Sequence, residues 1–340
     1  MKKKYRIGII PGDGIGRDVI RAAQIVLETV NGVSKEFSLE FSRMDTGDAA
    51  VAKYGNPFPP ETVEWIKQTY AVLFGAAGNP NTTKVLMGFR LGFNLYANVR
   101  PIKALAGSGA LRPKADLIIV RENTEGLYGG VGYIAGDTYV NLRIFTKQGM
   151  ERILRFCFEL ALKEGRKKVT FTHKAHVLTY TDEPMRQMFY EIAKKYPSVE
   201  AEDMTIVACA MQIVMRPERF DIVFAENANG DILSDVRAGV VGGMGFAYSG
   251  NIGDAMAVFE PIHGTAPKYA DKNVVNPIAA IMAAKMMFDY LGEKTTGSQV
   301  EKAITDVLVE GKMRTYDLGG TSSTTQVAEA ISEKLQKSLA

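Results

Sequence analysis

The alternation of short apolar segments with amphipathic helical segments restricts the fold of this 340-residue chain more than any other feature. Tyr5–Ile10 is apolar and β-rich, and it leads into the glycine-rich segment Pro11–Gly16. Apolar residues then recur at helical spacing from Val19 to Leu27. A strand, a glycine turn and a helix in this order make one α/β unit, so the chain predicts a sheet with helices packed on it.

The same unit recurs along the sequence. Apolar strands are expected at 71–75, 116–120, 168–172 and 220–225, and helices at 151–163, 277–291 and 325–335. The stretch 126–143 differs, because glycines, tyrosines and short β segments predict a hairpin. In an open α/β sheet, ligands bind beyond the carboxyl ends of the strands. Polar residues directly after the strands are therefore the candidate site.

The composition excludes several classes of protein. The chain is 46% hydrophobic and 23% charged, and its net charge of +3 with scattered basic residues gives no case for nucleic-acid binding. No apolar stretch has the length of a membrane helix, and the first residues lack a signal-peptide pattern. The two cysteines, Cys157 and Cys209, are far apart in sequence. We expect a cytoplasmic protein of two lobes, since 340 residues are long for one core.

An aspartate pair stands in the segment Asn229–Asp235, which reads NGDILSD. If this segment is helical, Asp231 and Asp235 share one face with their Cβ atoms about 5–6 Å apart. A divalent cation between the carboxylates would offset their repulsion. A helix surface on which Asp231 is the cap and Asp235 is solvated fits the spacing equally well. The spacing alone leaves both interpretations open.

Three arginines form a second candidate group. Arg90, Arg100 and Arg121 stand near expected strand ends, and arginine holds a planar carboxylate through two parallel hydrogen bonds. Together they would clamp a di- or tricarboxylate, whereas singly each would more often form a surface salt bridge. The glycine segment Gly12–Gly16 is a poor dinucleotide fingerprint, because Arg17 occupies the position of its third glycine. A tight turn is the favoured role for it.

Two loops complete the candidates. His173-Lys174-Ala175-His176 follows an expected strand, and a lysine near a metal or arginines can lose its proton and act as a base. A solvated loop explains that segment as well. The Pro- and Gly-rich segment Glu260–Tyr269, with Asn276 after it, could wrap a nucleotide with its backbone and offer Lys268 to a phosphate. Neither pattern is diagnostic alone.

Taken together, these segments resemble the β-decarboxylating dehydrogenases, the family of isocitrate, 3-isopropylmalate and homoisocitrate dehydrogenases. The matching motifs are PGDGIG (11–16), LYANVRP (95–101), RENTEGLY (121–128), NGDILSD (229–235), SGNIGD (249–254), HGTAP (263–267) and DLGG (317–320). The resemblance implies an α/β fold of two lobes with an inter-lobe cleft, not a Rossmann fold. The large, cofactor-side lobe would be 1–99 plus 253–340. The small lobe would be 100–252, with a dimer-clasp arm at about 126–143 and the metal-binding helix.

The resemblance also implies an activity, the metal-dependent oxidative decarboxylation of a (2R,3S)-2-hydroxy-3-carboxy acid with NAD(P)⁺. Arg90, Arg100 and Arg121 would hold the substrate's carboxylates, and Asp231 and Asp235 would bind Mg²⁺ or Mn²⁺. A homodimer with shared active sites, or a higher oligomer, is implied.

In that homodimer the partner's Lys174 would be the base for the 2-hydroxyl, and Tyr128 would supply a proton after CO₂ leaves. The residues implied for the cofactor pocket are His263, Gly264, Thr265, Ala266, Lys268, Tyr269 and Asn276.

Two positions depart from the family pattern. The family places a third metal-binding aspartate, from the partner subunit, where this chain has Val207. Asp203 precedes it by four residues and could share a helix face with it. His176 replaces an asparagine that touches the nicotinamide end of the site. These departures favour a second hypothesis, a catalytically impaired regulatory paralogue.

Cofactor and substrate preferences follow from the same resemblance. Lys268-Tyr269 stand where NAD-using members carry an acid, which favours NADP. Isocitrate enzymes place a serine and an asparagine at the positions of Lys84 and Leu86. Lys84 could pair with a carboxylate, whereas Leu86 resembles the apolar wall that accepts an isopropyl group. Because Lys268 and the tail 317–324 resemble isocitrate enzymes, we rank isocitrate first, then 3-isopropylmalate, then homoisocitrate.

Overall fold

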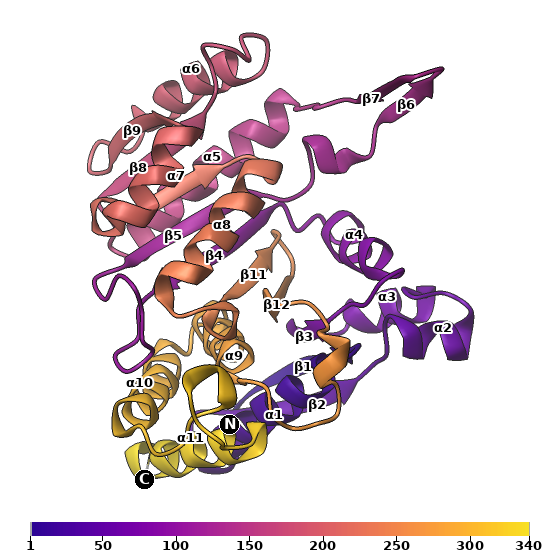
Figure 1. Ribbon diagram of the computed structural model, residues 1–340, viewed down its shortest axis with the longest axis vertical. Coiled ribbons are helices and arrows are strands. Elements are labelled where there is room, and N and C mark those ends of the chain that lie inside the picture. Colours follow the sequence, from indigo (N-terminus) through magenta and orange to yellow (C-terminus); the bar gives the residue numbers. More distant parts are fainter. Residues whose placement is uncertain (1, 340) are drawn as a thin grey trace.

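A ten-stranded sheet runs through both halves of the molecule in the computed structural model, which describes residues 2–339 (Figure 1). The strand order is β2-β1-β3-β12-β11-β4-β5-β10-β8-β9, and the sheet does not close into a barrel. Its strands are β1 (Lys3–Gly12), β2 (Phe37–Arg43), β3 (Ala71–Ala76), β4 (Ala97–Lys103), β5 (Asp116–Glu122), β8 (Lys168–His173), β9 (Glu200–Thr205), β10 (Ile222–Ala225), β11 (Tyr248–Ile252) and β12 (Ala257–Pro261). The predicted α/β class is confirmed.

The two halves of the sheet meet at antiparallel strands. β11 pairs antiparallel with both β12 and β4, and β4 pairs antiparallel with β5. The remaining pairs in this sheet are parallel. β4 and β11 therefore join the part built from both chain ends to the part built from the middle.

Helices cover both halves of the sheet. They are α1 (Gly16–Val33), α2 (Asp48–Tyr54), α3 (Pro60–Ile66), α4 (Thr82–Gly92), α5 (Lys147–Lys163), α6 (Asp182–Ala193), α7 (Ile206–Met215), α8 (Asn227–Val241), α9 (Ile278–Leu291), α10 (Lys294–Glu310) and α11 (Thr324–Leu339). One apolar cluster combines residues from both chain ends, such as Ile7 and Ile304, and another comes from the middle, such as Phe158 and Phe171. The predicted boundaries near 99 and 253 stay predictions.

The glycine segment after β1 is a tight turn, as expected. Gly12 and Gly14 have φ angles of 67° and 56°, in the left-handed region that favours glycine. The Asp13 carboxylate between them is buried and accepts hydrogen bonds from the backbone N–H groups of Asp48 (2.9 Å) and Gly78 (2.8 Å). Asp13 thus ties the turn to the segments after β2 and β3.

The hairpin expected within 126–143 is also present. β6 (Gly132–Ala135) and β7 (Thr138–Asn141) pair antiparallel and extend away from the rest of the molecule at the upper right of Figure 1. Ile134 and Tyr139 are 72% and 79% exposed. An apolar arm this exposed is typical of a segment that contacts another chain. Its role as a dimer clasp stays a prediction.

Candidate active site

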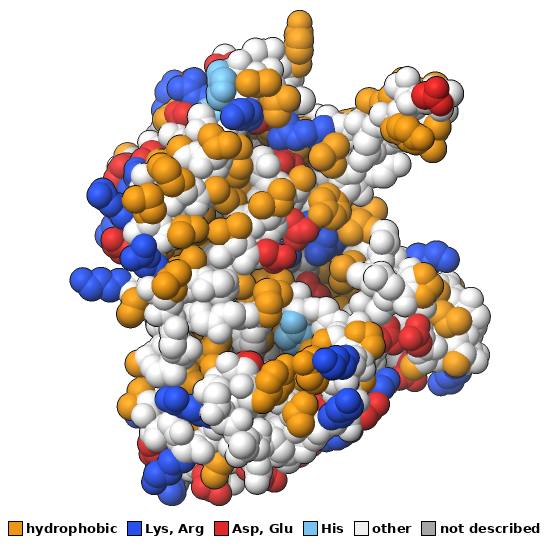
Figure 2. All heavy atoms as spheres, viewed as in Figure 1, with side chains coloured by type: hydrophobic (Ala, Val, Ile, Leu, Met, Phe, Trp, Pro, Cys, Tyr) orange, Lys and Arg blue, Asp and Glu red, His pale blue; other side chains and the backbone are white. Residues whose placement is uncertain are grey.

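A pocket of about 280 Å³ lies between the two halves (Figure 2). Its wall includes nine of the residues singled out from the sequence: Leu86, Arg90, Arg100, Arg121, Tyr128, Asp231, Asp235, His263 and Gly264. Acidic and basic side chains lie side by side in this hollow in Figure 2. The pocket adjoins the carboxyl end of β3, where an α/β sheet binds its ligands.

Helix α8 presents the aspartate pair to the pocket. The Glu226 carboxylate caps this helix by accepting hydrogen bonds from the backbone N–H groups of Ala228 (3.1 Å) and Asn229 (2.9 Å). Asp231 therefore lies inside the helix, and the alternative that it serves as the cap is wrong. Asp235 follows one turn later, and both aspartates line the pocket.

Adjacent strands β4 and β5 bring two of the arginines together. Arg100 and Arg121 are buried, and both face Asp231. Arg121 Nη1 donates to Asp231 Oδ1, and Arg100 Nη1 lies 3.4 Å from the same oxygen. Asn227 Oδ1 accepts from Arg121 Nε (3.0 Å) and Nη2 (2.7 Å). The two guanidinium groups are thus held rigidly before any ligand binds.

Arg90 reaches the pocket from α4, in the other half of the molecule. Its side chain is buried, and its Nε has no hydrogen-bond partner among the described residues. Burial, with the charge of Arg121, lowers the pKa of Arg90 to about 10, so it remains protonated at neutral pH. Burial and the charge of Arg121 also lower the pKa of Arg100 to about 10. A buried guanidinium with an unused donor beside a pocket suits a carboxylate ligand.

Tyr128 and Asp231 are linked directly. The Tyr128 hydroxyl donates to Asp231 Oδ2 at 2.8 Å, and its ring lies 5.0 Å from the guanidinium carbon of Arg121. Burial and the bond to Asp231 raise the pKa of Tyr128, which keeps its proton at neutral pH. Burial alone would raise the pKa of Asp231, but Arg121 and Arg100 outweigh it and hold that pKa below its usual value. The pocket therefore combines an ionised carboxylate with a protonated phenol.

The aspartate pair fits a small hard cation with few protein ligands. Asp235 is exposed, and its carboxylate has no hydrogen-bond or ion-pair partner among the described residues. No group of three His, Cys, Asp or Glu side chains in 2–339 has the arrangement of a metal site. Mg²⁺ commonly uses one or two carboxylates and completes its octahedron with water and substrate oxygens. Asp231 and Asp235 can serve in that way, although Asp231 is shared with two arginines.

The position expected to carry a third aspartate offers no ligand. Val207 lies in the first turn of α7 and is 60% exposed. Asp203 lies in β9 rather than in α7, so the suggestion that it shares a helix face with Val207 is wrong. Asp203 also accepts hydrogen bonds from His173 Nε2 (2.7 Å) and the Tyr190 hydroxyl, and it forms an ion pair with Arg186 Nε (3.1 Å). These three donors occupy its carboxylate, and it does not replace the missing ligand.

Three of the other predicted residues lie outside the pocket wall. Lys174 and His176 follow β8, and Lys84 is exposed on the first turn of α4. The role of Lys174 was expected in the partner's site, so its position outside its own pocket does not test that role. Their assignments stay predictions.

The expected cofactor loop packs against the glycine turn. The Ile15 N–H donates to Thr265 O at 2.9 Å, and a Cβ on Gly14 would collide with Thr265. His263 Nδ1 lies 3.0 Å from Gly264 O, whereas its Nε2 is screened from solvent and has no partner among the described residues. Burial lowers the pKa of His263, so it is neutral at pH 7. This unpartnered nitrogen beside a Gly-rich backbone fits a bound nucleotide.

The other residues predicted for the cofactor pocket lie further along the chain, within the loop and just before α9. Lys268 Nζ lies 5.6 Å from the centre of the Tyr269 ring, which stacks on Tyr316. Asn276 Oδ1 accepts from the Ile278 N–H at 3.0 Å and thereby holds the start of α9. Ala266 has a φ of 34°, in the left-handed region. Contact of these residues with a cofactor stays a prediction.

Sequence reasoning missed a buried amide network beneath the arginines. Asn251 Oδ1 accepts from Asn98 Nδ2 (2.7 Å) and Asn123 Nδ2 (2.9 Å), and Asn251 Nδ2 donates to Glu260 Oε1 (2.7 Å). Asn98 Oδ1 in turn accepts from Arg100 Nε. The three asparagines stand inside the quoted motifs, so motif membership was the available signal for them. Their function as a set depends on strand pairings far apart in sequence.

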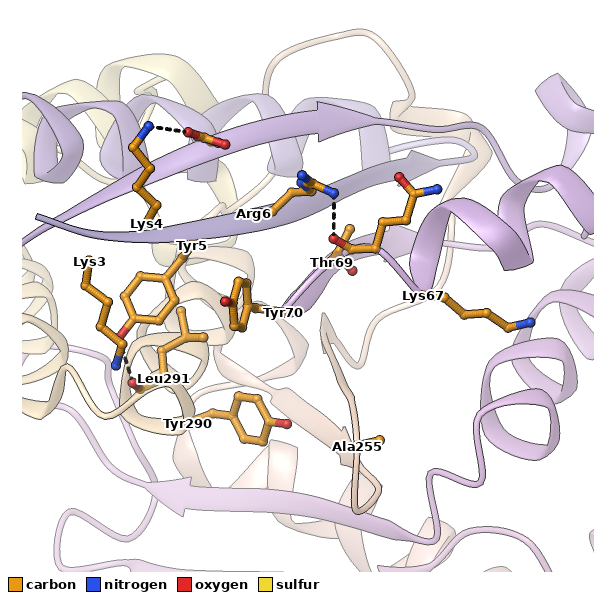
Figure 3. A pocket seen from close by; sticks show the side chains of 12 residues that line it. Lys3, Lys4, Tyr5, Arg6, Lys67, Thr69, Tyr70, Ala255, Tyr290 and Leu291 are labelled. Carbon is orange, nitrogen blue, oxygen red and sulfur yellow. Dashed lines mark hydrogen bonds and ion pairs between the residues drawn. The ribbon is translucent and has the colours of Figure 1, made fainter.

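A larger cavity than this pocket lies elsewhere on the molecule. A groove of about 850 Å³ at the amino ends of β1 and β3 is lined by Lys3, Arg6, Lys67, Tyr70 and Tyr290, among others (Figure 3). Arg6 donates to a backbone carbonyl, and Lys67 pairs with Glu64. None of the residues predicted for the site lies in it. Size alone therefore does not identify the active site.

Comparisons with known proteins agree with the pocket. The sequence model described as isocitrate/isopropylmalate dehydrogenase matches residues 6–331. The chain is 43% identical to 3-isopropylmalate dehydrogenase of Archaeoglobus fulgidus, over 97% of this chain and 99% of that one. It is 46% identical to isocitrate/homoisocitrate dehydrogenase of Thermus thermophilus, with 98% and 99% covered.

A solved structure gives the same result. Isocitrate dehydrogenase from Methylococcus capsulatus superposes with a TM-score of 0.92 at 39% identity, covering 98% of this chain and 99% of that one. The chain therefore belongs to the isocitrate/isopropylmalate dehydrogenase family of metal-dependent, decarboxylating dehydrogenases that use NAD or NADP.

Proposed function

We propose that this enzyme oxidatively decarboxylates a 3-alkylmalate, with 3-isopropylmalate as the preferred member of that class. The observation that carries the proposal is the position of Leu86, which lines the pocket with Phe74 and Ile262, whereas Lys84 is exposed on α4 and is not part of the pocket wall. A third carboxylate would meet these apolar side chains without a cation, whereas an alkyl group would be buried favourably. This reverses the order that the sequence favoured.

Isocitrate is the second candidate. Thr82 also lines the pocket, and its hydroxyl donates to Ala77 O (3.1 Å). That hydroxyl could turn to a third carboxylate at the cost of one backbone bond, roughly 1 kcal/mol.

The three arginines suit the two carboxylates that the candidate acids share. Arg90 contributes an unused buried donor from α4, and Arg100 and Arg121 line the same pocket from β4 and β5. Together they orient the substrate with C2 and C3 in a fixed place. Asp231 and Asp235 would hold the divalent cation, which would supply Lewis-acid stabilisation, and the nicotinamide cofactor would supply the hydride acceptor.

The proton transfers are assigned to two side chains. The partner's Lys174 takes the proton of the 2-hydroxyl as the hydride leaves C2. The C3 carboxylate then departs as CO₂, and Tyr128 returns a proton to C3. A raised pKa supports Tyr128 as the donor, because the phenol still carries its proton at neutral pH.

We propose NADP as the preferred cofactor, as the sequence suggested. Lys268 is exposed on the loop beside His263, and no carboxylate bonded to it is present among the described residues. A cation there favours a ribose 2′-phosphate over a 2′-hydroxyl. Lys268→Asp should lower the ratio of kcat/KM for NADP⁺ to that for NAD⁺ by at least about tenfold, or about 1.4 kcal/mol. An unchanged ratio would remove Lys268 from the proposal.

The partner that this function requires is a second copy of the chain. Exposed apolar side chains gather on α7 and α8: Val207, Met211, Val214, Met215, Ile232 and Val236 (Figure 2). An exposed apolar patch of this kind marks an interface. Analytical ultracentrifugation should give a dimer or a multiple of it, and Met211→Glu should weaken that association.

Among the described residues, none of the helices combines the length and the apolar character that a membrane span requires.

The substrate proposal is tested by comparing three acids on one enzyme. Initial rates with 3-isopropylmalate, isocitrate and homoisocitrate should give the highest kcat/KM for 3-isopropylmalate. Leu86→Asn should shift the ratio towards isocitrate by about tenfold or more, within the range that one pocket contact controls. The matched control is Leu91→Asn, since Leu91 is 52% exposed on the same helix and outside the pocket. A wild-type preference for isocitrate would overturn the proposal.

A further inference from the structure

Arg143 lies where three functional segments of the chain meet. It follows the arm strand β7, and its side chain is mostly buried. Arg143 Nη1 donates to Asp182 Oδ1 (2.6 Å) and to Thr181 Oγ1 (3.0 Å). Its Nη2 lies 3.7 Å from Glu226 Oε1. One guanidinium therefore links the arm, the start of α6 and the start of α8.

The contact with Asp182 leads to Lys174. The Asp182 carboxylate is only 1% exposed, and its second oxygen, Oδ2, accepts a hydrogen bond from the Lys174 N–H at 2.7 Å. The loop from Lys174 to Thr181 is thus closed at its base by Asp182. Arg143 in turn fixes the orientation of that carboxylate, so a change at Arg143 reaches the backbone of Lys174 through one side chain.

The contact with Glu226 leads to the aspartate pair. Glu226 is 4% exposed and caps α8, the helix that carries Asp231 and Asp235. Its position sets where the first turn of α8 begins. Asp231 follows five residues after Glu226, so a displaced cap moves the first turns of the helix and the carboxylates they carry.

Charge and geometry explain why this position is an arginine. Two buried carboxylates flank one cation, and the Nη2 of Arg143 is itself buried without a hydrogen bond among the described residues. The planar fork of arginine addresses two carboxylates in different directions, which a lysine ammonium does less well. The guanidinium also lies 4.6 Å from the centre of the Phe145 ring. Removing it would leave both acids without their shared cation.

We propose that Arg143 is a positioning residue that sets the Lys174 loop relative to the aspartate helix, and so couples the two active sites of a homodimer. The inference rests on the proposed function, in which Lys174 acts in the partner's site while Asp231 and Asp235 act in their own. A displacement at Arg143 in one chain then disturbs two sites in different ways. It misplaces the base in one and the metal-binding helix in the other.

Hybrid dimers separate these effects. One chain carries Asp235→Asn and the other carries Lys174→Met, and the two chains bear different purification tags. Only one site is then complete, with α8 from the Lys174→Met chain and the lysine from the Asp235→Asn chain. Arg143→Lys is placed in either chain in turn, because it keeps the charge between the buried acids and favours folding.

Each placement has its own expected result. In the lysine-donating chain, Arg143→Lys should lower kcat about tenfold and leave the Mg²⁺ concentration for half-maximal rate unchanged. In the chain that supplies α8, it should raise that Mg²⁺ concentration about tenfold. The control is Arg155→Lys in either chain, since Arg155 forms a surface pair with Glu151 on α5. The control should change neither quantity by more than about twofold.

Three results would overturn the inference. One is that Arg143→Lys changes kcat or the Mg²⁺ concentration for half-maximal rate in only one of the two placements, or in neither of them. Another is an equal loss of kcat and Mg²⁺ affinity in both placements together with a lower melting temperature, which marks a general structural role. The third is a hybrid with no activity although the unmodified enzyme turns over. That result shows that the sites are not shared, so it separates failure of the proposed function from failure of the coupling.

Discussion

The inter-lobe pocket and the surface formed by α7 and the loop after β8 differ in how their side chains are held. In the pocket, Arg100 and Arg121 are buried and bonded to Asp231. On the other surface, Val207 is exposed, and His176 lies in an exposed turn. The chain keeps the family's residues where it builds its own site and departs from them where it would serve a partner.

This difference teaches where substitution is costly. Replacing Arg121 would leave the Asn227 amide oxygen without its two donors and would remove one of the cations that face Asp231, in a place where water cannot fully substitute. A valine at position 207 in place of the family's aspartate leaves no buried group without a hydrogen-bond partner. The position is exposed, and Asp203 nearby in sequence has other donors. The second region is therefore free to change without unfolding the protein.

The largest effect is expected from Asp235→Asn in the pocket. The amide removes one of two metal-binding carboxylates, so Mg²⁺-supported kcat/KM should fall by more than about 100-fold, beyond the loss typical of groups that only support a ligand. Asp306→Asn makes the same chemical change in a surface pair on α10 and should leave the rate unaltered. Unchanged turnover in Asp235→Asn would refute the metal assignment and remove the contrast between the two regions.

Stability should separate the regions next. Arg121→Met should lower the free energy of unfolding by about 3 kcal/mol, since it removes a buried guanidinium with its partly buried ion pair to Asp231 and its two hydrogen bonds to Asn227. Arg186→Met removes one partner of Asp203 on the other surface, where His173 and Tyr190 remain, and should cost about 1 kcal/mol or less. Urea unfolding followed by circular dichroism measures both. Equal losses would show that the two regions are equally constrained.

A smaller effect is expected from restoring the missing acid. If shared sites lack a third carboxylate because of Val207, Val207→Asp should lower the Mg²⁺ concentration for half-maximal rate by about tenfold, roughly 1.4 kcal/mol. Val207→Asn supplies polarity without charge and should give little change. Isothermal titration of Mg²⁺ in the presence of substrate provides an independent reading. No change in Val207→Asp would show that two carboxylates with substrate and water already suffice.

The smallest effect concerns pH. Burial opposes ionisation of Asp231, but Arg121 and Arg100 outweigh it and leave its pKa below the usual 3.8. Burial likewise opposes ionisation of Asp203, and Tyr190, His173 and Arg186 outweigh it and lower that pKa. A lowered pKa stabilises the fold above about pH 4, and the contribution is lost as pH falls through the folded value.

In the unmodified enzyme, the urea concentration at the midpoint of unfolding should therefore decrease as the pH is lowered from 6 to 3. Asp231→Asn and Asp203→Asn should each flatten that fall relative to their own values at pH 6. Thr172→Val offers a control that removes a buried hydroxyl without changing charge. An acid-side fall identical in all three variants would mean that neither carboxylate carries the linkage.

Much of this architecture could be predicted from the sequence because local patterns determine it. The apolar strands before Pro11 and Arg121, the glycine turn and the arm hairpin were all expected and are present. β9 was missed, because its residues Glu200–Thr205 are mostly polar, as suits an edge strand. The strand expected from 220 begins at Ile222, since Phe220 completes the preceding turn.

The site was less predictable than the fold. The aspartates, arginines and Tyr128 were found by motif, and they meet in one pocket. The link through Arg143 depends on contacts with Asp182 and Glu226, about 40 and 80 residues away, which spacing along the chain does not reveal. The cap by Glu226 is local, but it was not expected because the sequence left Asp231 as the candidate cap. The substrate order changed for the same reason, because only the packing of α4 shows that Leu86 and not Lys84 lines the pocket.

The most direct test of the central claim is a turnover measurement on the unmodified chain. NADPH formation and CO₂ release are followed together with 3-isopropylmalate, NADP⁺ and Mg²⁺, and again after chelation of the metal. The account predicts equal amounts of the two products at a rate of about 1–10³ s⁻¹, lost on chelation. The absence of both products with every candidate acid and with either nucleotide would contradict it and support a regulatory paralogue instead.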